Sequence, residues 1–164
     1  MGRYRPPTPP SSPYITRVGF EQLQQEQKAI WTRRADVTAA LSAAAAEGDR
    51  SENAEYIYRK KELRELDRRI RYLQKRLPDL TIVDRRADTD HVYFGATVEL
   101  EADNGEERCV TLVGSDEIDP SKGHISIDSP VARALLKKQI DDDIEVVVDG
   151  KKISYTVLAI RYEL

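Results

Sequence analysis

Two long segments with a heptad pattern, separated by one short break, constrain this chain more than any other feature. Over about residues 17–47 and 51–77, apolar side chains recur at alternating spacings of three and four residues. This period gives each helix one apolar seam, and a seam is stable only when a partner covers it. Because few residues separate the segments, we expect the helices to fold back on each other as an antiparallel hairpin. Trp31 is expected to pack against the second helix, which should stop before Pro78.

The break between the two segments contains signals that end one helix and start the next. Gly48 favours the left-handed conformation in which helices commonly end. Asp49 is followed three residues later by Glu52, which fits a capping box with Asp49 as the N-cap. Ser51 is an alternative N-cap, and the sequence does not choose between them. We therefore expect an acidic turn at the tip of the hairpin.

Asp49 and Glu52 allow two interpretations. Carboxylates bind hard cations, and Mg²⁺ typically takes one or two of them and completes its shell with water and phosphate oxygens. Two carboxylates on an exposed tip would then form an incomplete metal site that another molecule has to complete. Acids are also common at the start of a helix, where they act as caps and complement the helix dipole. The residues alone favour the capping interpretation, and the metal interpretation stays open.

The second helix is strongly basic on the face opposite its seam. Residues 50–77 carry ten Lys and Arg residues against five Asp and Glu residues. A solvated helix face is the simplest explanation, but a ridge of a single sign repels itself, so we favour contact with a polyanion. Five basic residues at alternating spacings of three and four are predicted to form this ridge: Lys61, Arg64, Arg68, Arg71 and Lys75.

Charge divides the 164-residue chain into unlike halves. Residues 1–83 carry 16 basic against 11 acidic residues, a balance of +5, and residues 84–164 carry 10 against 18, a balance of −8. Opposite signs suggest a polyanion as partner of the first half and a basic protein surface as partner of the second. Cys109 is the only cysteine, which excludes an intramolecular disulfide and favours a reducing, cytoplasmic location. No apolar run approaches the ~18 residues of a membrane span, and we expect no membrane partner.

The two ends of the chain differ from the helical region in composition and period. Residues 1–15 are rich in proline and are expected to form a disordered tail. Residues 79–164 contain short β-rich segments separated by turn signals. One helix interrupts them, with a cap and a proline in the sequence Asp128-Ser129-Pro130. The fold class is therefore α+β, with an antiparallel sheet folded around one helix after residues 16–78.

Several motifs together closely resemble the bacterial Gre transcript cleavage and elongation factors. The dense basic charge of the second helix is similar to the GreB type of this family. The likeness covers about residues 15–164, and its most specific parts are the tip and the Asp-Ser-Pro motif. The matching stretches are Gly48-Asp49-Arg50-Ser51-Glu52-Asn53-Ala54-Glu55-Tyr56, Arg59-Lys60-Lys61, Asp67-Arg68-Arg69-Ile70-Arg71-Tyr72-Leu73, and Ile125-Ser126-Ile127-Asp128-Ser129-Pro130.

This resemblance implies a fold and a function. Residues 16–78 would form a coiled coil that enters the secondary channel of RNA polymerase, and residues 79–164 an FKBP-like domain that holds the channel rim. Asp49 and Glu52 would be the catalytic acids, helping to hold a Mg²⁺ ion shared with the polymerase while the backtracked 3′ segment of the nascent RNA is hydrolysed. One ion activates the nucleophile and the other stabilises the leaving oxygen in such two-metal sites. The factor would act as a monomer and would not be an enzyme by itself.

The resemblance also implies contact surfaces. The loop at Asp141-Asp142-Asp143 departs from the family pattern, which usually reads Gly-Asp followed by an apolar residue. The residues expected to contact RNA or the channel wall are Arg50, Arg59, Lys60, Lys61, Arg64 and Arg68. The residues expected to dock on the polymerase are Asp116, Glu117, Asp128, Ser129 and Pro130.

Three other functions compete with this one. A related regulator could occupy the channel without stimulating cleavage, but such proteins have altered tips, and here both Asp49 and Glu52 are present. An FKBP-like fold could suggest a prolyl isomerase or chaperone, although a fold alone carries no activity. A free-standing nucleic-acid binder would use the basic ridge and would bind duplex DNA with a steep salt dependence.

Overall fold

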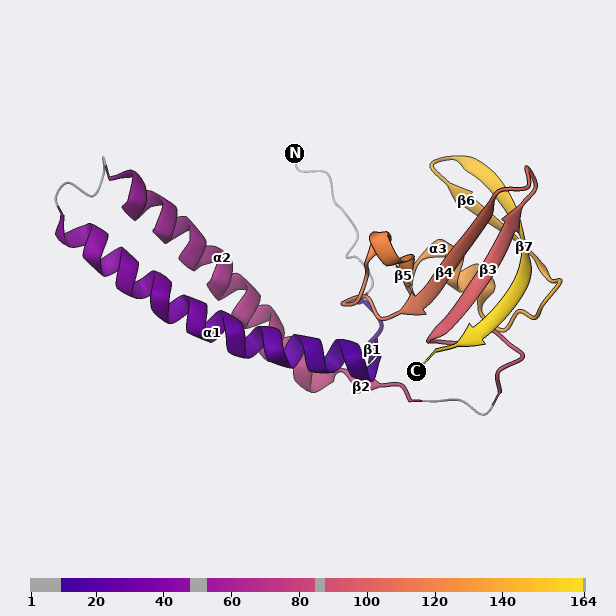
Figure 1. Ribbon diagram of the computed structural model, residues 1–164, viewed down its shortest axis with the longest axis horizontal. Coiled ribbons are helices and arrows are strands. Elements are labelled where there is room, and N and C mark those ends of the chain that lie inside the picture. Colours follow the sequence, from indigo (N-terminus) through magenta and orange to yellow (C-terminus); the bar gives the residue numbers. More distant parts are fainter. Residues whose placement is uncertain (1–9, 48–52, 85–87, 164) are drawn as a thin grey trace, which may run out of the picture. The chain divides into compact units, whose positions relative to one another are not determined.

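Residues 10–47, 53–84 and 88–163 are described by the computed structural model (Figure 1). The chain forms two units, one of residues 18–80 and the other of residues 81–164 together with the N-terminal residues 1–17. Among the described residues, no helix combines the length and the apolar character needed to cross a bilayer.

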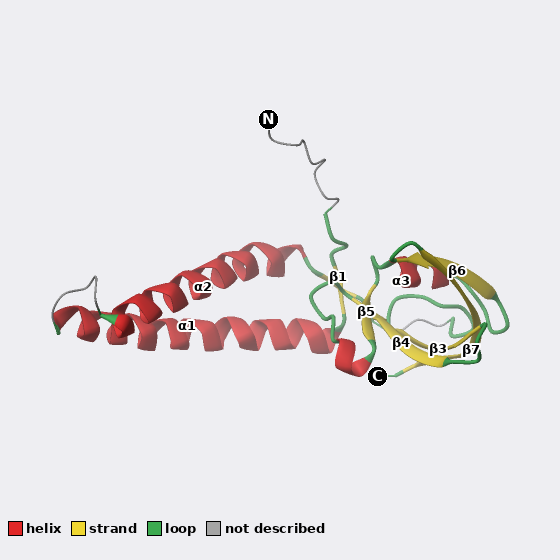
Figure 2. Cartoon of the chain, turned by 90° about the horizontal axis from the view of Figure 1, so that it is seen from above, coloured by secondary structure: helices red, strands yellow, loops and turns green. Residues whose placement is uncertain are grey.

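The first unit is a pair of long helices. Helix α1 spans Arg17–Ala46 and α2 spans Ala54–Arg76, and the two run in opposite directions side by side (Figure 2). A short 3₁₀ helix, η1 (Leu77–Asp79), follows α2 and contains Pro78 in its first turn. The predicted hairpin is thus confirmed, although α2 starts a few residues later than expected. The buried apolar side chains of the seam are Leu23, Val37, Ala44, Ile70 and Leu73.

Trp31 is less buried than a seam residue. It exposes 47% of its surface, and its packing against α2 stays a prediction. Its ring lies under the guanidinium group of Arg34, with the Arg34 Cζ atom 6.0 Å from the ring centroid.

The second unit is built on a five-stranded sheet with the strand order β5-β4-β3-β7-β6. Neighbouring strands are antiparallel except β4 and β5, which are parallel. The sheet is therefore mixed and not purely antiparallel, because residues 114–123 fold back before β5 begins. The strands are β3 (Ala96–Ala102), β4 (Glu107–Val113), β5 (His124–Ser126), β6 (Asp143–Val148) and β7 (Lys151–Tyr162).

Helix α3 (Pro130–Leu135) completes the core of this unit. The Ser129 side chain caps the helix by accepting a hydrogen bond from the backbone N–H of Ala132, and Pro130 stands in the first turn as predicted. The α+β class is confirmed, whereas the expected likeness to FKBP domains stays a prediction. The fully buried core side chains include Val98, Leu100, Leu112, Leu135 and Val157.

The N-terminal segment also belongs to this unit. Strand β1 (Tyr14–Ile15) pairs in parallel with β2 (Thr81–Ile82), and Ile15 is fully buried. A β-carbon at Gly114 would lie 2.1 Å from the carbonyl oxygen of Tyr14, so only glycine fits there. The disordered tail expected over residues 1–15 is therefore wrong for residues 14 and 15, because Ile15 gains burial and strand pairing that composition does not reveal. Residues 1–9 lie outside the described part of the chain.

Candidate functional site

The start of α2 is set by Asn53. Its side-chain oxygen accepts a hydrogen bond from the backbone N–H of Tyr56 at 3.2 Å, which makes Asn53 the N-cap. The side-chain amide nitrogen of the same residue donates to the carbonyl oxygen of Ala44 in α1, at 2.9 Å. Asn is among the best N-cap residues, and here it also joins the two helices.

This cap corrects the one expected from the sequence. We expected Asp49 as the N-cap of α2, with Glu52 at the third helical position of a capping box, or Ser51 as an alternative N-cap. Since α2 begins at Ala54 after the cap Asn53, its third position is Tyr56. The capping box was the competing explanation for the two tip acids, and this helix start does not use it. Asp49, Glu52 and the expected contact residue Arg50 themselves lie outside the described residues.

Basic side chains that face the partner helix are paired with acids. Arg33 Nη2 lies 2.6 Å from Glu62 Oε1, and Arg34 Nε lies 2.7 Å from Asp67 Oδ1. Arg69 Nε lies 2.7 Å from Glu26 Oε1. Each pair joins α1 to α2 and fixes their antiparallel register.

Arg59 is drawn into the same network. It lies 2.8 Å from Glu55 and 3.1 Å from Glu62. The hydrogen bond to Glu55 raises the pKa of Arg59, and the hydrogen bond from Arg33 lowers the pKa of Glu62. Arg59, one of the expected RNA-contacting residues, is thus already engaged by its own helix.

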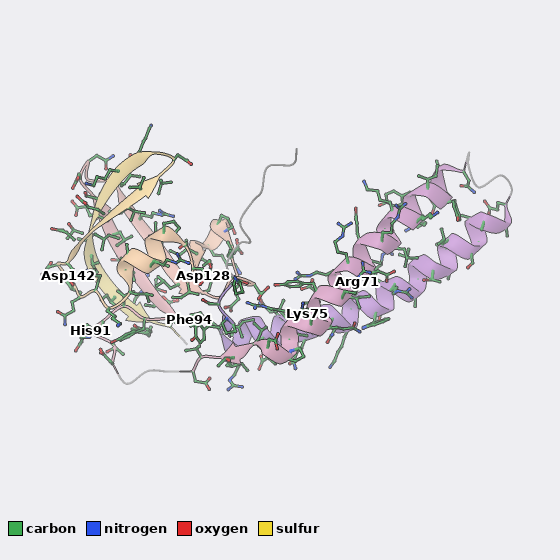
Figure 3. All side chains as sticks on the ribbon, turned by 180° about the vertical axis from the view of Figure 1, so that it is seen from behind. Arg71, Lys75, His91, Phe94, Asp128 and Asp142 are labelled. Carbon is green, nitrogen blue, oxygen red and sulfur yellow. The ribbon has the colours of Figure 1, made fainter. Side chains whose placement is uncertain are left out.

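The basic residues of the predicted ridge, by contrast, face solvent. All five of its members, Lys61, Arg64, Arg68, Arg71 and Lys75, are exposed. In the part of the chain that the structure describes, no acid forms an ion pair with any of them. Figure 3 labels Arg71 and Lys75 on α2. Lys60 is exposed too, and its ammonium group lies 5.9 Å from the ring centroid of Tyr56.

Two of the expected docking acids hold the chain's own N-terminal segment. Glu117 accepts hydrogen bonds from the backbone N–H of Thr16 at 3.1 Å, from the Thr16 hydroxyl, and from the backbone N–H of Gly114 at 2.8 Å. Asp128 accepts from the backbone N–H of Ser12 at 2.8 Å and from the Ser12 hydroxyl. Sequence reasoning missed these partners, because Ser12 and Thr16 border a proline-rich stretch that carries no signal of tertiary contact.

The other docking candidates differ in accessibility. Ser129 is half-buried and used as the α3 cap, Asp116 is half-buried, and Pro130 is exposed. Ile118 lies in the same loop as Glu117 and exposes 52% of its surface. It is a large apolar side chain on an acidic surface, which the sequence analysis did not single out.

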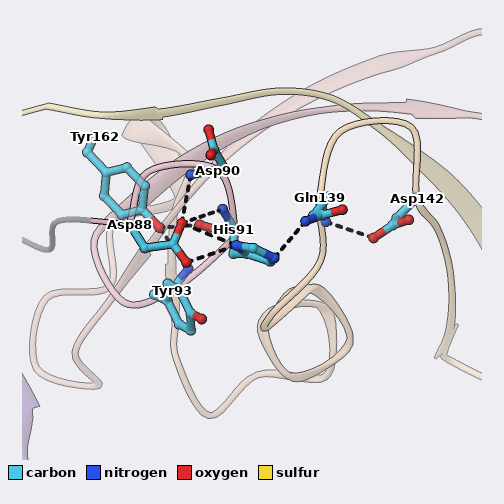
Figure 4. Close-up of polar contacts among 7 residues, drawn as sticks. All are labelled: Asp88, Asp90, His91, Tyr93, Gln139, Asp142 and Tyr162. Carbon is cyan, nitrogen blue, oxygen red and sulfur yellow. Dashed lines mark hydrogen bonds and ion pairs between the residues drawn. The ribbon is translucent and has the colours of Figure 1, made fainter.

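A second polar cluster surrounds His91 (Figure 4). His91 Nδ1 lies 2.9 Å from the Asp88 carboxylate, and its Nε2 lies 2.7 Å from Gln139 Nε2. The hydrogen bond to His91 lowers the pKa of Asp88. Tyr162 donates its hydroxyl to the carbonyl of His91 at 2.6 Å. These contacts attach the loop before β3 to the segment after α3.

The neighbouring acidic loop takes an unusual backbone conformation. Asp141 has a φ of 71°, and its N–H donates to Val157 at 2.8 Å. Asp142 accepts a hydrogen bond from the backbone N–H of Gln139 at 2.7 Å. Asp is one of the few non-glycine residues that tolerate the left-handed region. The Asp that stands where the resemblance leads us to expect Gly therefore keeps a left-handed turn there.

Among the described residues, no group of three or more His, Cys, Asp or Glu side chains could hold a metal ion. The oxygen donors of Asp49 and Glu52 are of the type that Mg²⁺ prefers, but these residues lie outside the described ranges. The expected Mg²⁺ therefore stays a prediction.

Comparison with known proteins identifies the family. The family description "Transcription elongation factor, N-terminal" matches residues 13–82, and "Transcription elongation factor, GreA/GreB, C-term" matches residues 87–162. Transcription elongation factor GreB of Xanthomonas axonopodis pv. citri is 52% identical over 99% of this chain and 98% of its own length. GreB of Yersinia pestis is 54% identical over 92% of this chain and 90% of its own length.

A solved structure titled as a prokaryotic transcription elongation factor GreA/GreB from Nitrosomonas europaea is 24% identical, with a TM-score of 0.42. It covers 92% of this chain and 100% of its own length. The family match extends over both units, and the GreB relatives share about half of their residues with this chain across nearly its whole length. The chain therefore belongs to the GreA/GreB family of transcription elongation factors, as the sequence motifs predicted.

Proposed function

We propose that this protein binds RNA polymerase through the secondary channel and stimulates cleavage of the 3′ end of backtracked nascent RNA. The observation that carries the proposal is the division of charge on α2. Its Arg59 and Arg69 are paired with acids, whereas the ridge of Lys61, Arg64, Arg68, Arg71 and Lys75 is exposed and forms no ion pair with any described residue. A slender hairpin with such a ridge suits a channel in which it meets RNA and an acidic wall. Arrested elongation complexes would be rescued by the cleavage.

The chemistry belongs to the tip. Asp49 and Glu52 supply two carboxylates, which would fill only part of an octahedral site for Mg²⁺, and the polymerase would supply the rest. Bound there, Mg²⁺ would lower the pKa of a water and make it a nucleophile. The protein is accordingly not an enzyme alone, because it completes the active site of its partner.

The ridge would guide the RNA. Lys60, Lys61, Arg64 and Arg68 lie on the exposed surface of α2 within a few turns of its start at Ala54. Contacts between basic side chains and phosphates are strongly salt-dependent and independent of base sequence. The extruded RNA 3′ segment would therefore be held along α2 without a sequence requirement.

Docking would use the loop that contains Asp116, Glu117 and Ile118, together with Pro130. Because Glu117 and Asp128 are occupied by Thr16 and Ser12, we assign the direct contact to the exposed Ile118 and to the acidic field around it. Replacing Ile118 by Asp should weaken binding to the polymerase. Ile140 offers a matched control, because it also exposes 52% of its surface in the same unit, and Ile140→Asp should leave binding unchanged.

A cleavage assay on stalled polymerase complexes tests the proposal. Added protein should shorten the RNA at its 3′ end in a Mg²⁺-dependent reaction, and the restarted complexes should extend it. Binding without shortening would instead identify a regulator that occupies the channel. The free thiol of Cys109 is exposed, which suits the reducing cytoplasm. The protein would act there as a monomer.

A further inference from the structure

Two tyrosines of α2 are exposed beside the basic ridge. Tyr58 exposes 61% of its surface and Tyr72 exposes 40%, so neither ring is buried in the seam with Ile70 and Leu73. The two tyrosines occupy the same heptad position, two heptads apart, which corresponds to about 21 Å along the helix. A single exposed ring needs no explanation, but a repeat at one helical position beside a charged ridge calls for one.

The ring of Tyr58 lies against an arginine that is itself held in place. The Arg59 Cζ atom lies 5.6 Å from the centroid of the ring, within the range of a cation–π contact. Arg59 is fixed in turn by ion pairs with Glu55 at 2.8 Å and with Glu62 at 3.1 Å. The ring therefore has a fixed support and still presents most of its surface to solvent.

The ring of Tyr72 has the same kind of support. The Arg69 Cζ atom lies 5.2 Å from its centroid, and Glu26 accepts hydrogen bonds from Arg69 Nε at 2.7 Å and from Nη2 at 3.0 Å. An aromatic ring beside an arginine fixed by acids thus occurs twice on α2. Glu65 occupies the same heptad position between the two tyrosines, so the rings form two separate sites.

Each ring also borders the ridge. Side chains three or four positions apart are neighbours on the surface of a helix. Lys61 lies three residues after Tyr58, and Lys75 lies three residues after Tyr72. Arg68 lies four residues before Tyr72. Within the described ranges no acid forms an ion pair with these three basic residues, so their charge is available to an anionic ligand.

Aromatic rings that alternate with basic side chains match the chemistry of a single nucleic-acid strand. Proteins that bind single strands without sequence preference hold the phosphates with basic side chains and stack the bases on aromatic rings. A duplex keeps its bases stacked on one another, so it offers these rings no base face. An acidic protein segment would satisfy the charge of the ridge without using the rings.

We propose that Tyr58 and Tyr72 are stacking platforms for unpaired bases of single-stranded RNA whose phosphates lie along the ridge. This inference rests on the proposed function, in which α2 meets the extruded RNA 3′ segment. It adds a contact with the bases to the contact with the phosphates. Every base has a π face, so the platforms select a single strand over a duplex without selecting a sequence.

The decisive variant is Tyr58→Ala, measured as the full-length protein. Its binding to a fluorescent single-stranded RNA is followed by anisotropy over a range of salt concentrations that begins at low salt. We expect binding to be about 5- to 100-fold weaker, with an unchanged slope of log affinity against log salt, because a stacked base releases no counterions. Lys61→Ala should instead reduce that slope by about one. Tyr72→Ala should weaken binding less than Tyr58→Ala, because its ring is less exposed.

Two variants at the same place serve as matched controls. Ile57 exposes 54% of its surface beside Tyr58 but carries no ring, so Ile57→Ala should bind RNA within about twofold of wild type. Tyr58→Phe keeps the ring and should do the same. An abasic strand of equal length removes the bases from the ligand, and wild type and Tyr58→Ala should bind it equally. Thermal unfolding of each variant checks that the hairpin stays folded.

The outcomes separate stacking from the other contacts. The platform is overturned if Tyr58→Ala binds the RNA as wild type does, or if it loses as much on the abasic strand. An equal loss in Ile57→Ala would also overturn it, because a general apolar contact would then explain the binding, and so would a wild type that binds no RNA at low salt. The cleavage assay is read independently: cleavage without an effect of Tyr58 on RNA binding rejects the platform alone. RNA binding that depends on Tyr58 without cleavage rejects the proposed function alone.

Discussion

The hairpin and the sheet unit are stabilised by different interactions. The sheet unit buries a continuous apolar cluster from β3, β4, β6, β7 and α3. The hairpin has a thin seam of five buried apolar side chains, Leu23, Val37, Ala44, Ile70 and Leu73, and adds ion pairs such as Arg34–Asp67. Exposed ion pairs contribute only about 0.2–1 kcal/mol each. Apolar burial therefore stabilises the sheet unit, whereas the hairpin is a scaffold that presents charged side chains.

The largest effect is expected in the sheet core. Leu100 and Leu73 are both fully buried, but Leu100 is enclosed by sheet and helix, whereas Leu73 lies in a seam that can close around a gap. Leu100→Ala should cost about 2–5 kcal/mol of unfolding free energy, with Leu73→Ala at the low end of that range. Thermal unfolding combined with region-resolved hydrogen exchange measures both. A larger loss of unfolding free energy in Leu73→Ala than in Leu100→Ala would contradict this difference between the two units.

The tip should respond to charge and not to packing. Asp49→Asn and Glu52→Gln keep the shape of the side chains and remove the negative charge that a hard cation needs. Losing a contact worth about 3 kcal/mol in the transition state slows cleavage roughly a hundredfold. Polymerase binding and folding should stay near normal, and raised Mg²⁺ should restore part of the rate.

Glu55→Gln is the matched control for the tip. Glu55 stands in the first turn of α2 and pairs with Arg59 at 2.8 Å, so the same loss of charge occurs close to the tip without touching the proposed catalytic pair. Cleavage should be unaffected. Wild-type rates in Asp49→Asn and Glu52→Gln would leave these acids without a catalytic role.

The ridge should affect RNA engagement and leave stability unchanged. We expect the double variant Lys61→Glu and Arg64→Glu to weaken cleavage of long backtracked RNA about tenfold at low salt, with a smaller effect as salt screens the charges. Its unfolding free energy should change by less than about 0.5 kcal/mol, as for most surface substitutions.

A control variant carries the same change of charge in the other unit. Arg108 and Lys151 are exposed on the sheet unit, and reversing both to Glu should leave cleavage of long RNA unchanged. Equal losses in the two double variants would mean that net charge matters and the position of the ridge does not.

The smallest effect concerns pH and the ion pairs of the hairpin. The hydrogen bond from Arg33 holds the pKa of Glu62 below its ordinary value of 4.5. A carboxylate with a lowered folded-state pKa contributes stability above its unfolded pKa, and that contribution is lost as pH falls through the folded value. The stability difference between wild type and Glu62→Gln should therefore be constant above about pH 5 and shrink below pH 4.5. Acid titration followed by helical circular dichroism measures this, and a difference that grows on acidification would contradict it.

Much of the fold follows from local pattern. The heptad spacing predicted both helices, and β-rich segments separated by turn signals predicted that residues 79–164 form a sheet with one helix. The helix cap at Ser129 and the outward exposure of Arg64 and Arg68 were predictable in the same way. These features depend on residues close together in the chain, where periodicity and capping preferences act directly.

Contacts between distant residues could not be predicted. Ser12 and Asp128 meet across the sheet unit, and nothing in a proline-rich stretch indicates that its serine donates to a helix-capping motif. Trp31 exposes 47% of its surface, and its ring lies near the guanidinium group of Arg34.

By itself the sequence determined the helical hairpin, the family and the single sign of the ridge, because periodicity, motif and charge are properties of the chain alone. Only the tertiary structure decided that Arg69 of α2 is paired, since that depends on Glu26 being brought opposite it by α1. It also decided that Asn53 caps α2. Asp49, Ser51 and Asn53 are nearly equal as caps, and the carbonyl of Ala44, which only the folded hairpin brings within 2.9 Å, gives Asn53 a second bond.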